Sequence, residues 1–406
     1  MAPRRSADLV IVGAGTIGGW ASVFARQLGA ERVVVLERDL VGQGASSRAG
    51  GVVRQQGGTP DTVRLGSFSV DFYRTQASRS GADSGFRELG YVILAVSAAD
   101  ERAAHERVAM QREAGLDARW CNADEVRGLN PTLADRGFRG GTFVTSDGAI
   151  DPPRNVRAYS LAMQRAGVEL LERTAFLGLR TRKGRGGARV VTGVETTAGP
   201  ISTSLAVLTG GPSLRAVAKL AGARAWVGGA RHQIAISQPH PAFDVERQPM
   251  VFDIGAGLYW RLEEGGLLWG MSNPNETPGP ATEVDWPYLR RMQRRLARLV
   301  PVTAGLGIRK AWAATIEYTP DHLPLLGPLV GTDGVQIVGA SIATACGHGM
   351  MWGPAVSRIA TDLALAGRTE VVERVEDFRM DRFDERGRSP FSDPVALPFP
   401  VDVADD

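Results

Sequence analysis

The first forty residues alternate between apolar runs and a helical pattern of hydrophobic positions. Four consecutive apolar residues, Leu9–Val12, predict a strand that is buried on both faces. A glycine-rich turn and a helical pattern follow, and a second apolar run over 33–36 predicts another strand, which ends at Glu37. This order of strand, turn, helix and strand is typical of a parallel sheet that binds a nucleotide.

The rest of the chain predicts both helices and strands. Helical spacing of apolar residues is found over 59–80, 98–114, 151–166, 286–299 and 354–366. Short apolar runs predict strands over 86–96, 138–145, 168–179, 201–208 and 335–338. Between 225 and 270, alternating apolar positions separated by turn residues predict an antiparallel sheet.

These elements predict an α/β protein in which two domains are interleaved, with a cleft between them. A Rossmann-type dinucleotide-binding domain is expected over 1–85, 146–224 and 308–370. An α+β substrate domain, built on the antiparallel sheet, is expected over 86–145 and 225–307. The charged, proline-bearing segment 371–406 is expected to be a peripheral tail.

The turn after the first strand matches the pattern G-x-G-x-x-G. Gly13 permits the tight turn, Gly15 lets the backbone approach a pyrophosphate, and Gly18 lets the helix pack closely on the strand. The helix N-terminus offers free N–H groups to phosphates, and Glu37 can accept hydrogen bonds from ribose hydroxyls. The context predicts dinucleotide binding, although the motif alone does not separate FAD from NAD.

Other glycine-rich segments are expected to converge on the same nucleotide. The loop 41–58 is rich in glycine and serine, and its Arg48 and Arg54 suit phosphates or an anionic ligand. A predicted strand ends in glycines at 209–212, and the glycines of 347–349 precede a helix whose first N–H groups are free. The aromatic residues between 225 and 270 could line a substrate site or fill a core.

Composition and charge exclude several other classes of protein. The chain has 406 residues, of which 43% are apolar and 22% charged, as in an ordinary globular protein. Its arginines are scattered, which argues against nucleic-acid binding. Two cysteines, Cys121 and Cys346, provide neither a disulfide framework nor metal-ligand spacing. Since we find no signal peptide and no apolar run that could span a membrane, we expect a cytoplasmic protein without a metal.

Four segments resemble one family of flavoenzymes. They are VIVGAGTIGG with the later LER, GASSRAGGVVRQ, AWAATIEYTPDHLPLLGP and ACGHGMMWGPAV, in the family's order and over nearly the whole chain. The chain resembles the FAD-dependent amine and amino-acid oxidoreductases that include D-amino acid oxidase, glycine oxidase and the sarcosine oxidases. The GHGMMWGP run and the RHQI strand are most similar to the sarcosine oxidase β-subunit type.

This resemblance implies bound FAD and a small-molecule amine or amino acid as substrate, of the N-methyl amino acid, cyclic imino acid or D-amino acid type. The C–N bond is oxidised by hydride transfer to flavin N5, and water hydrolyses the resulting imine. Oxygen or another acceptor then takes the electrons from the reduced cofactor.

The resemblance also assigns site residues. Those expected at the catalytic centre are Arg54, Tyr259, Trp260 and His348. Those expected to bind the cofactor are Gly13, Gly15, Thr16, Ile17, Gly18, Glu37, Arg38, Ser46, Ser47, Arg54, Phe176, Gly210, Gly347, His348, Gly349 and Met350. The last four are implied at the flavin's pyrimidine end, where N–H groups and positive charge stabilise the reduced anion.

Two positions depart from the family's pattern in the segment before TPDHLPLLGP. Ala314 replaces the cysteine that holds FAD covalently in monomeric sarcosine oxidase, so we expect FAD to be bound non-covalently. Ile316 replaces the arginine that binds the substrate carboxylate in glycine oxidase. Three side chains remain for that role, namely Arg54, His232 and Arg261.

A further departure concerns the strand over the flavin. Leu268 and Ser272 stand where a lysine and a histidine occur in sarcosine oxidase, so His348 or Arg54 would have to supply positive charge. Glu317 lies near the predicted cleft and could contact a substrate ammonium, or it could be a surface or ion-paired residue.

Two other functions explain part of the sequence. An NAD(P)-dependent dehydrogenase would account for the first glycine turn but not for TPDHLPLLGP or CGHGMMWGP. A non-catalytic flavoprotein, or a subunit that needs partners, would account for the missing lysine and arginine. For single residues, the structural alternatives are a loop salt bridge for Arg54 and a helix-start position for His348.

Overall fold

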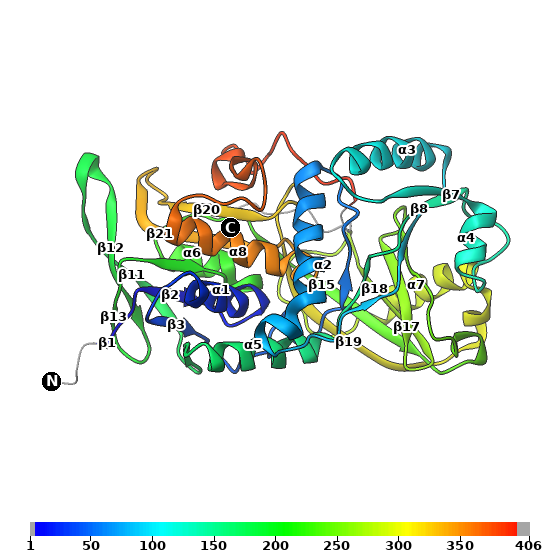
Figure 1. Cartoon of the computed structure of the whole chain (residues 1–406), viewed down its shortest axis with the longest axis horizontal. Helices are drawn as coiled ribbons and strands as arrows, with labels where there is room; N and C mark the ends of the chain where they lie inside the picture. The colour runs from blue at the N-terminus through cyan, green and yellow to red at the C-terminus, as the bar shows by residue number, and fades with distance from the viewer. Residues whose placement is uncertain (1–4, 396–406) are drawn as a thin grey trace.

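The computed structural model describes residues 5–395 and contains two large sheets. The ten-stranded sheet, here called the first sheet, lies in one half of the elongated molecule, and the eight-stranded second sheet lies in the other (Figure 1). The alternating helices and strands confirm the predicted α/β fold. Within residues 5–395 we find no helix with both the length and the apolar character that a bilayer span requires.

Five parallel strands form the centre of the first sheet, in the order β21–β14–β2–β3–β10. Their bounds are Gln336–Thr344, Ala206–Leu208, Leu9–Val12, Val33–Leu36 and Glu169–Leu171. Every residue of β2, β3 and β14 is buried, as expected for parallel strands that are covered on both faces. The sheet is completed by β1 (Arg5–Ser6), β11 (Phe176–Lys183), β12 (Arg189–Thr196), β13 (Ile201–Ser202) and β20 (Leu325–Val330).

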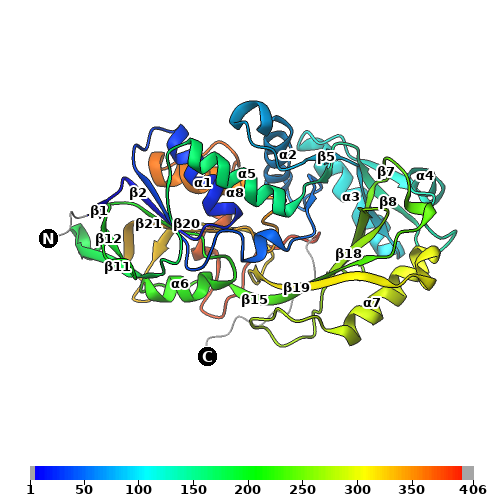
Figure 2. The same ribbon diagram turned by 90° about the horizontal axis from the view of Figure 1, so that it is seen from below.

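Helices cover the two faces of the first sheet. On one face lie α1 (Thr16–Gln27), α5 (Pro152–Arg165) and α8 (Gly353–Ala366), and on the other lies α6 (Leu214–Leu220) (Figure 2). The long helix α2 (Pro60–Ser80) stands between the two halves of the molecule. Because β2 leads directly into α1, the start of this helix lies at the carboxyl edge of the sheet, where nucleotides bind.

The second sheet has the order β19–β15–β18–β17–β16–β6–β8–β7. The bounds of these strands are Ile308–Tyr318, Gly228–Ser237, Gly266–Ser272, Leu258–Glu263, Met250–Asp253, Tyr91–Ala95, Gly140–Val144 and Arg119–Asn122. All neighbours pair antiparallel except β16 and β6, which are parallel. The strands within 225–270 pair antiparallel, as predicted, and the parallel pair joins them to β6. Its outer face packs against α7 (Trp286–Leu299) and α4 (Ala123–Leu129), and its inner face turns toward the junction of the two halves.

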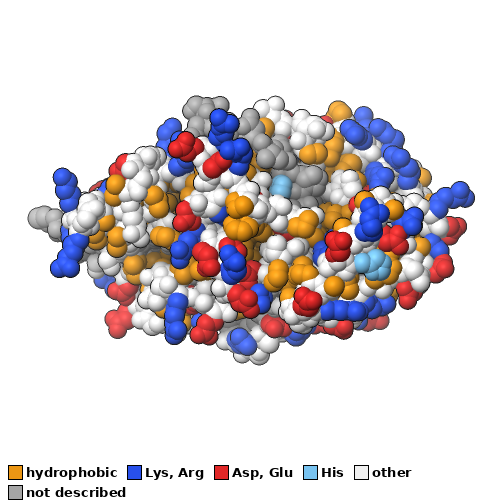
Figure 3. Space-filling model, turned by 90° about the horizontal axis from the view of Figure 1, so that it is seen from above, with side chains coloured by type: hydrophobic (Ala, Val, Ile, Leu, Met, Phe, Trp, Pro, Cys, Tyr) orange, Lys and Arg blue, Asp and Glu red, His pale blue; other side chains and the backbone are white. Residues whose placement is uncertain are grey.

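Smaller elements complete the second half. The helix α3 (Ala98–Glu113) packs near β6 and β8, and a three-stranded sheet joins β4 (Val52–Val53), β9 (Gly148–Ala149) and β5 (Arg87–Glu88). On the face shown in Figure 3, Lys and Arg side chains are interspersed with Asp and Glu.

Several segments differ from the sequence-based expectation. The strand regions predicted over 168–179 and 201–208 each contain parts of two strands. Residues 86–96 form two strands, β5 and β6, because Gly90 between them adopts a φ of 78°. The strand predicted over 335–338 extends to Thr344. β19, expected in the dinucleotide-binding domain, pairs with β15 in the second sheet. The boundary predicted at residue 308 therefore does not coincide with a change of sheet, and the division into two domains stays a prediction.

The C-terminal segment packs into the protein, contrary to the peripheral tail predicted for 371–406. Val395 is fully buried, and Arg382 forms an ion pair with Asp321 in which both side chains are almost inaccessible to water. Two hydrogen bonds, of 2.6 and 3.0 Å, join the guanidinium to the two carboxylate oxygens. The part of the predicted tail over 396–406 lies outside the described residues.

Removal of one partner of this buried pair should destabilise the protein. Arg382→Met leaves the Asp321 carboxylate buried and unpaired, so we expect the free energy of unfolding to fall by about 3–5 kcal/mol. The matched control is Arg388→Met, because Arg388 pairs with Asp384 on the surface, where ion pairs contribute little. Chemical denaturation followed by circular dichroism measures both variants. Equal stabilities would contradict the anchoring role of Arg382.

Candidate active site

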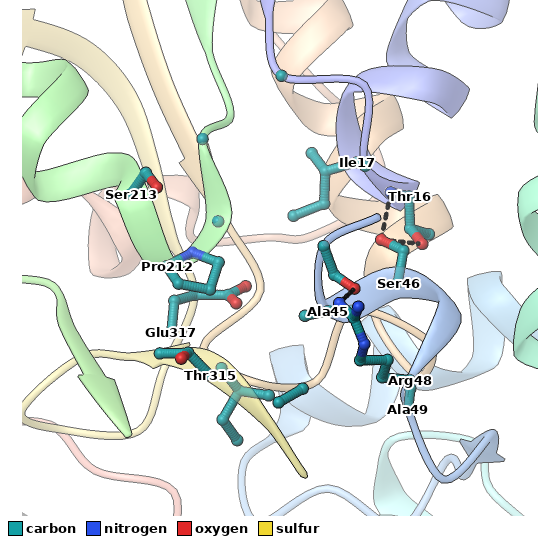
Figure 4. A pocket seen from close by; sticks show the side chains of 18 of the residues that line it. Thr16, Ile17, Ala45, Ser46, Arg48, Ala49, Pro212, Ser213, Thr315 and Glu317 are labelled. Carbon is teal, nitrogen blue, oxygen red and sulfur yellow. Dashed lines mark hydrogen bonds between the residues drawn. The ribbon is translucent and has the colours of Figure 1, made fainter. Parts of the chain in front are cut away.

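A cavity of about 620 Å³ opens where the carboxyl ends of the parallel strands face the inner side of the second sheet. Its lining comes from segments that are far apart in the sequence, and Figure 4 shows side chains from several of them. Gly13, Gly210 and Gly347 all line it, one from each of three glycine-rich segments.

The first glycine turn is shaped by close contacts. Gly13 has a φ of 101°, a conformation that glycine adopts readily. A Cβ atom at Gly18 would lie 1.9 Å from the Gly13 carbonyl oxygen, so only glycine lets α1 approach the turn this closely. The helix begins after Gly15 without a side-chain cap, which leaves N–H groups of its first turn available to a ligand.

Two side chains hold this turn from neighbouring segments. Ser46 Oγ accepts a hydrogen bond from the Thr16 N–H at 3.0 Å and another from Thr16 Oγ1 at 3.2 Å (Figure 4). Glu37 accepts from the N–H groups of Ala14 and Asp39, at 2.9 and 3.0 Å. Both carboxylate oxygens are therefore oriented by the backbone, and each keeps a further lone pair for a hydroxyl donor.

The turn before α8 carries a buried histidine. Cys346 and Gly347 have φ values of 50° and 73°, and the His348 ring lies against Trp352 with ring centroids 4.4 Å apart. Within residues 5–395, neither ring nitrogen of His348 has a hydrogen-bond partner. Burial, and to a lesser extent the charge of Arg54, lower the pKa of His348 to about 3. The ring is therefore neutral at neutral pH and does not supply the positive charge that the sequence led us to expect of it.

Arg54 places a fixed positive charge in the cavity. Its buried guanidinium donates from Nη2 to the Val395 carbonyl at 2.6 Å and from Nη1 to the Gln56 carbonyl. Among the described residues Arg54 forms no ion pair, unlike the loop salt bridge considered as its structural alternative. A guanidinium that is held by neutral carbonyls keeps its charge and further N–H donors for an anionic ligand.

Tyr259 and His232 form a hydrogen-bonded pair on the inner face of the second sheet. His232 Nε2 lies 2.8 Å from the Tyr259 hydroxyl, and Nδ1 lies 3.0 Å from Ser272 Oγ. The two rings are stacked, with centroids 5.7 Å apart and planes 5° apart. Cβ atoms at Gly50 and Gly270 would lie 2.3 and 2.2 Å from the Tyr259 hydroxyl, so both glycines make room for this ring.

This pair is uncharged at neutral pH. Burial lowers the pKa of His232 to about 4 and raises the pKa of Tyr259 well above its ordinary value. The cavity therefore presents a neutral, hydrogen-bonded imidazole and phenol next to a permanent cation.

Glu317 points into the cavity between Pro212 and Thr315 (Figure 4). Its Oε1 accepts from Thr344 Oγ1 at 3.0 Å, and burial raises the pKa of its carboxyl. Glu317 is neither on the surface nor, among the described residues, in an ion pair, so the two structural alternatives do not apply. A contact with a substrate ammonium stays a prediction.

Most of the predicted site residues line this one cavity, although their roles toward a ligand remain predictions. They are Gly13, Gly15, Thr16, Ile17, Glu37, Arg38, Ser46, Arg54, Phe176, Gly210, Tyr259, Gly347, His348, Gly349 and Met350. Gly18 and Ser47 do not line it. Gly18 instead shapes the cavity indirectly, because its lack of a side chain lets α1 pack closely on the turn at Gly13. Ser47 follows Ser46 on the short helix Ala45–Ser47.

Trp260, assigned to the catalytic centre from the sequence, does not line the cavity. Successive side chains of a strand point to opposite faces, and Tyr259 occupies the inner face. The Trp260 ring is therefore buried in the outer core beside Trp269, where it cannot reach the cavity.

Arg261 is also unavailable to a substrate. Its guanidinium donates to the Gly50 carbonyl at 2.9 Å and pairs with Glu263. Leu268 belongs to the apolar cluster of the inner face, so this position contributes no charge to the site. Of the three side chains considered for a substrate carboxylate, Arg54 and His232 line the cavity.

Some cavity residues were not predicted. Tyr91 and Phe252 line it from β6 and β16, whose continuous apolar runs did not reveal which side chains face inward. The loop 279–282 also borders it, and the Ala281 N–H donates to Thr315 Oγ1 at 2.9 Å. No local pattern could have placed this loop, because its position depends on a strand that follows it in the sequence.

The residues present fit an extended FAD. The cradle at Gly13–Gly18 is too narrow for side chains, Glu37 has lone pairs free for hydroxyls, and both ring nitrogens of the buried His348 lack protein partners among residues 5–395. In the same residues, no group of three or more His, Cys, Asp or Glu side chains could hold a metal.

The neutral state of His232 predicts acid sensitivity. Histidine in an unfolded chain protonates near pH ~6.5, whereas folded His232 protonates only near pH 4. Below about pH 6.5 the unfolded state therefore binds a proton that the folded state does not. From this group alone, the free energy of unfolding should fall by about 3 kcal/mol as the pH drops to about 4.

His232→Gln removes this contribution, so its stability should fall less than that of the wild type over the same pH range. Denaturant unfolding at several pH values between about 7 and 4 measures the difference. The exposed His105→Gln is the control and should follow the wild type. Parallel curves for wild type and His232→Gln would show that His232 titrates normally in the folded protein.

A family model and several known proteins match this chain over most of its length. The family model DAO, FAD dependent oxidoreductase, matches residues 8–363. The 4-methylaminobutanoate oxidase (formaldehyde-forming) of Paenarthrobacter nicotinovorans is 27% identical over 324 residues, which are 77% of this chain and 38% of that protein. Sarcosine oxidase subunit beta of Rhodobacter capsulatus is 24% identical over 331 residues, or 80% of this chain and 78% of that subunit.

The solved structures agree in fold. L-proline dehydrogenase from P. horikoshii has a TM-score of 0.85 and 24% sequence identity, and the match covers 95% of this chain and 100% of that one. The chain spans little more than a third of the 4-methylaminobutanoate oxidase, so the activity of that whole protein does not transfer directly. The match to the family model nevertheless extends over most of the chain and includes the glycine turn, Arg54 and the turn at His348. The resemblance inferred from the sequence is thus confirmed, and the chain belongs to the DAO family of FAD-dependent oxidoreductases.

Proposed function

We propose that this chain oxidises the C–N bond of a secondary amine or amino acid to an imine, which water then hydrolyses. The observation that carries the proposal is that one cavity holds both a dinucleotide cradle and a separate polar cluster of Arg54, His232 and Tyr259. Two relatives are named for their action on 4-methylaminobutanoate and sarcosine, which supports a substrate of the N-methyl amino acid class.

FAD, when bound, supplies the acceptor for the hydride. We assign its pyrophosphate to Gly13, Gly15 and the first turn of α1, and its adenosine ribose to Glu37. The turn 347–350 is assigned to the pyrimidine end of the flavin. Ala314 offers no nucleophile, so binding at this position is non-covalent.

Arg54 is assigned to the substrate carboxylate. It is the buried cation of the cavity that the described residues leave without a carboxylate partner. A charge-assisted hydrogen bond in a site shielded from water fixes one end of a zwitterionic substrate and thereby orients its C–N bond.

The Tyr259–His232 pair is assigned to the amine. Hydride transfer requires the lone pair of the substrate nitrogen, so an ammonium must first lose its extra proton. Because His232 stays neutral, the pair favours a substrate amine that has already lost this proton. The Tyr259 hydroxyl can donate to His232 Nε2, 2.8 Å away, and its oxygen can accept a hydrogen bond from the amine N–H. Ser272 Oγ holds the other ring nitrogen and fixes the orientation of the imidazole.

The acceptor for the electrons is oxygen or another small molecule or protein. Leu268 is apolar, and His348 is neutral, so Arg54 is the fixed charge available to stabilise a reduced oxygen species. We therefore propose that the reduced protein reacts more slowly with oxygen than with an artificial acceptor such as a phenazine dye.

The carboxylate assignment is tested by anaerobic reduction of the flavin with sarcosine, other N-methyl amino acids, proline and D-amino acids. For the best substrate, Arg54→Gln should raise the KM by about 100-fold, because a buried charged hydrogen bond is lost. The corresponding amine without a carboxylate should reduce wild type and variant at similar rates. If Arg54→Gln impairs flavin reduction equally by both substrates, Arg54 supports the fold or the binding of the flavin rather than the binding of the carboxylate.

The amine-binding assignment is tested at Tyr259. Tyr259→Phe should lower the rate of flavin reduction by about tenfold or more, because the neutral amine loses the hydrogen bond that orients its lone pair. Trp260→Phe is the matched control, since it changes the next residue on the same strand but on the opposite face. A reduction rate in Tyr259→Phe equal to that of Trp260→Phe would exclude the proposed role.

A flavin that no amine or amino acid of this panel reduces would favour the alternative of a non-catalytic or partner-dependent flavoprotein subunit. A protein that takes up nicotinamide nucleotide in place of flavin would contradict both functions.

A further inference from the structure

The last described residues of the chain contact residues that line the cavity. We call residues 389–395 the C-terminal strap. The Asp393 N–H donates to the Asp321 carbonyl at 3.2 Å, and the Val395 N–H donates to Asp393 Oδ1 at 2.8 Å. Asp321 also forms the buried ion pair with Arg382, so the strap and the segment before it are fixed to the same loop.

Gly58 provides the space in which the strap lies. A Cβ atom at Gly58 would stand 2.3 Å from Asp393 Oδ1 and 2.5 Å from Pro394 Cδ, both of which are part of the strap. The φ of Gly58 is not in the left-handed region, so alanine would fit the backbone there, and the three atoms nearest to its Cβ all belong to the strap.

Val395 makes two contacts with residues that line the cavity. Its carbonyl accepts the hydrogen bond of 2.6 Å from Arg54 Nη2. Its side chain is fully buried in the apolar cluster of the inner face, together with Tyr91, Phe252 and Tyr259. The strap therefore touches both the cation of the cavity and its aromatic wall.

We propose that the C-terminal strap is a second layer behind the substrate compartment, in which Val395 positions the Arg54 guanidinium through its carbonyl and, by supporting the aromatic wall with its side chain, limits the length of the ligand. The proposal rests on the proposed function in that it takes Arg54 as the group that binds the substrate carboxylate.

The planar geometry of the guanidinium explains how carbonyl contacts can position Arg54. The carbonyls of Val395 and Gln56 each occupy one N–H of the guanidinium, and together they fix its plane. The remaining donors then point in set directions, which decides where a carboxylate can sit. The isopropyl group of Val395 fills space behind the aromatic wall, so its loss lets the wall side chains move back and makes room for a longer aliphatic chain.

Two variants of the FAD-loaded protein separate these effects. Val395→Ala shortens the side chain and keeps the carbonyl, whereas Gly58→Ala displaces the strap without changing it. Gly128→Ala is the matched control, because no atom lies within 4 Å of a Cβ built at that position. The probes are acetate, butanoate and hexanoate, whose binding is followed by the change in the flavin absorption spectrum.

For Val395→Ala we expect the affinity for hexanoate relative to acetate to rise by about tenfold. For Gly58→Ala we expect the affinity for all three carboxylates to fall by about tenfold or more. Gly128→Ala should bind like the wild type. An unchanged chain-length preference in Val395→Ala, or an unchanged acetate affinity in Gly58→Ala, would overturn the proposal.

A second measurement does not depend on a bound carboxylate. Modification of Arg54 by phenylglyoxal, measured by peptide mass spectrometry, should be about tenfold faster in Gly58→Ala than in the wild type and in Gly128→Ala. Equal rates would overturn the contact between strap and Arg54. If no carboxylate perturbs the wild-type flavin, the carboxylate role of Arg54 in the proposed function fails, whereas the modification rates still decide whether the strap holds Arg54.

Discussion

The buried charge of Arg54 is the constraint around which the cavity is arranged. A guanidinium removed from water without a carboxylate partner costs several kcal/mol, and the carbonyls of Gln56 and Val395 offset only part of this. Two buried carboxyls, Asp147 and Asp393, are near enough to interact electrostatically with it. Among the described residues neither they nor any other carboxylate lies within ion-pairing distance, so the guanidinium keeps donors for a ligand. The same charge, added to the effect of burial, keeps the nearby His348 neutral.

Close approach of the backbone explains why glycines recur at this cavity. Gly18 lets α1 meet the turn at Gly13, Gly50 and Gly270 make room for the Tyr259 ring, and Gly58 makes room for the C-terminal strap. A glycine inside a helix costs about 1 kcal/mol relative to alanine. At Gly18 this cost is offset by the close packing of α1 on the turn. Residues with an unfavourable local conformational propensity are retained mostly at functional sites.

The two sheets contribute different chemistry to one space. The first sheet brings backbone N–H groups and the carboxylate of Glu37 to its carboxyl edge, which suits a dinucleotide. The second sheet brings a hydrogen-bonded pair of neutral side chains, Tyr259 and His232, on the face that borders the cavity. Strand alternation separates this pair from the apolar outer core, so Tyr259 and Trp260, adjacent in sequence, belong to different environments.

The sequence by itself determined the parallel strands, the first glycine turn with Glu37, and the three glycine-rich segments, because each depends on short-range pattern or on a local backbone requirement. It also determined the family, because the matching segments keep their order along the chain. Only the tertiary structure decided which of Tyr259 and Trp260 faces inward, that Arg261 is already engaged by Glu263, and that β16 pairs parallel with β6. Only the tertiary structure shows that the Val395 carbonyl accepts a hydrogen bond from Arg54, 341 positions away in the chain. Such contacts depend on register and on packing between distant segments, for which a local pattern of residues carries no signal.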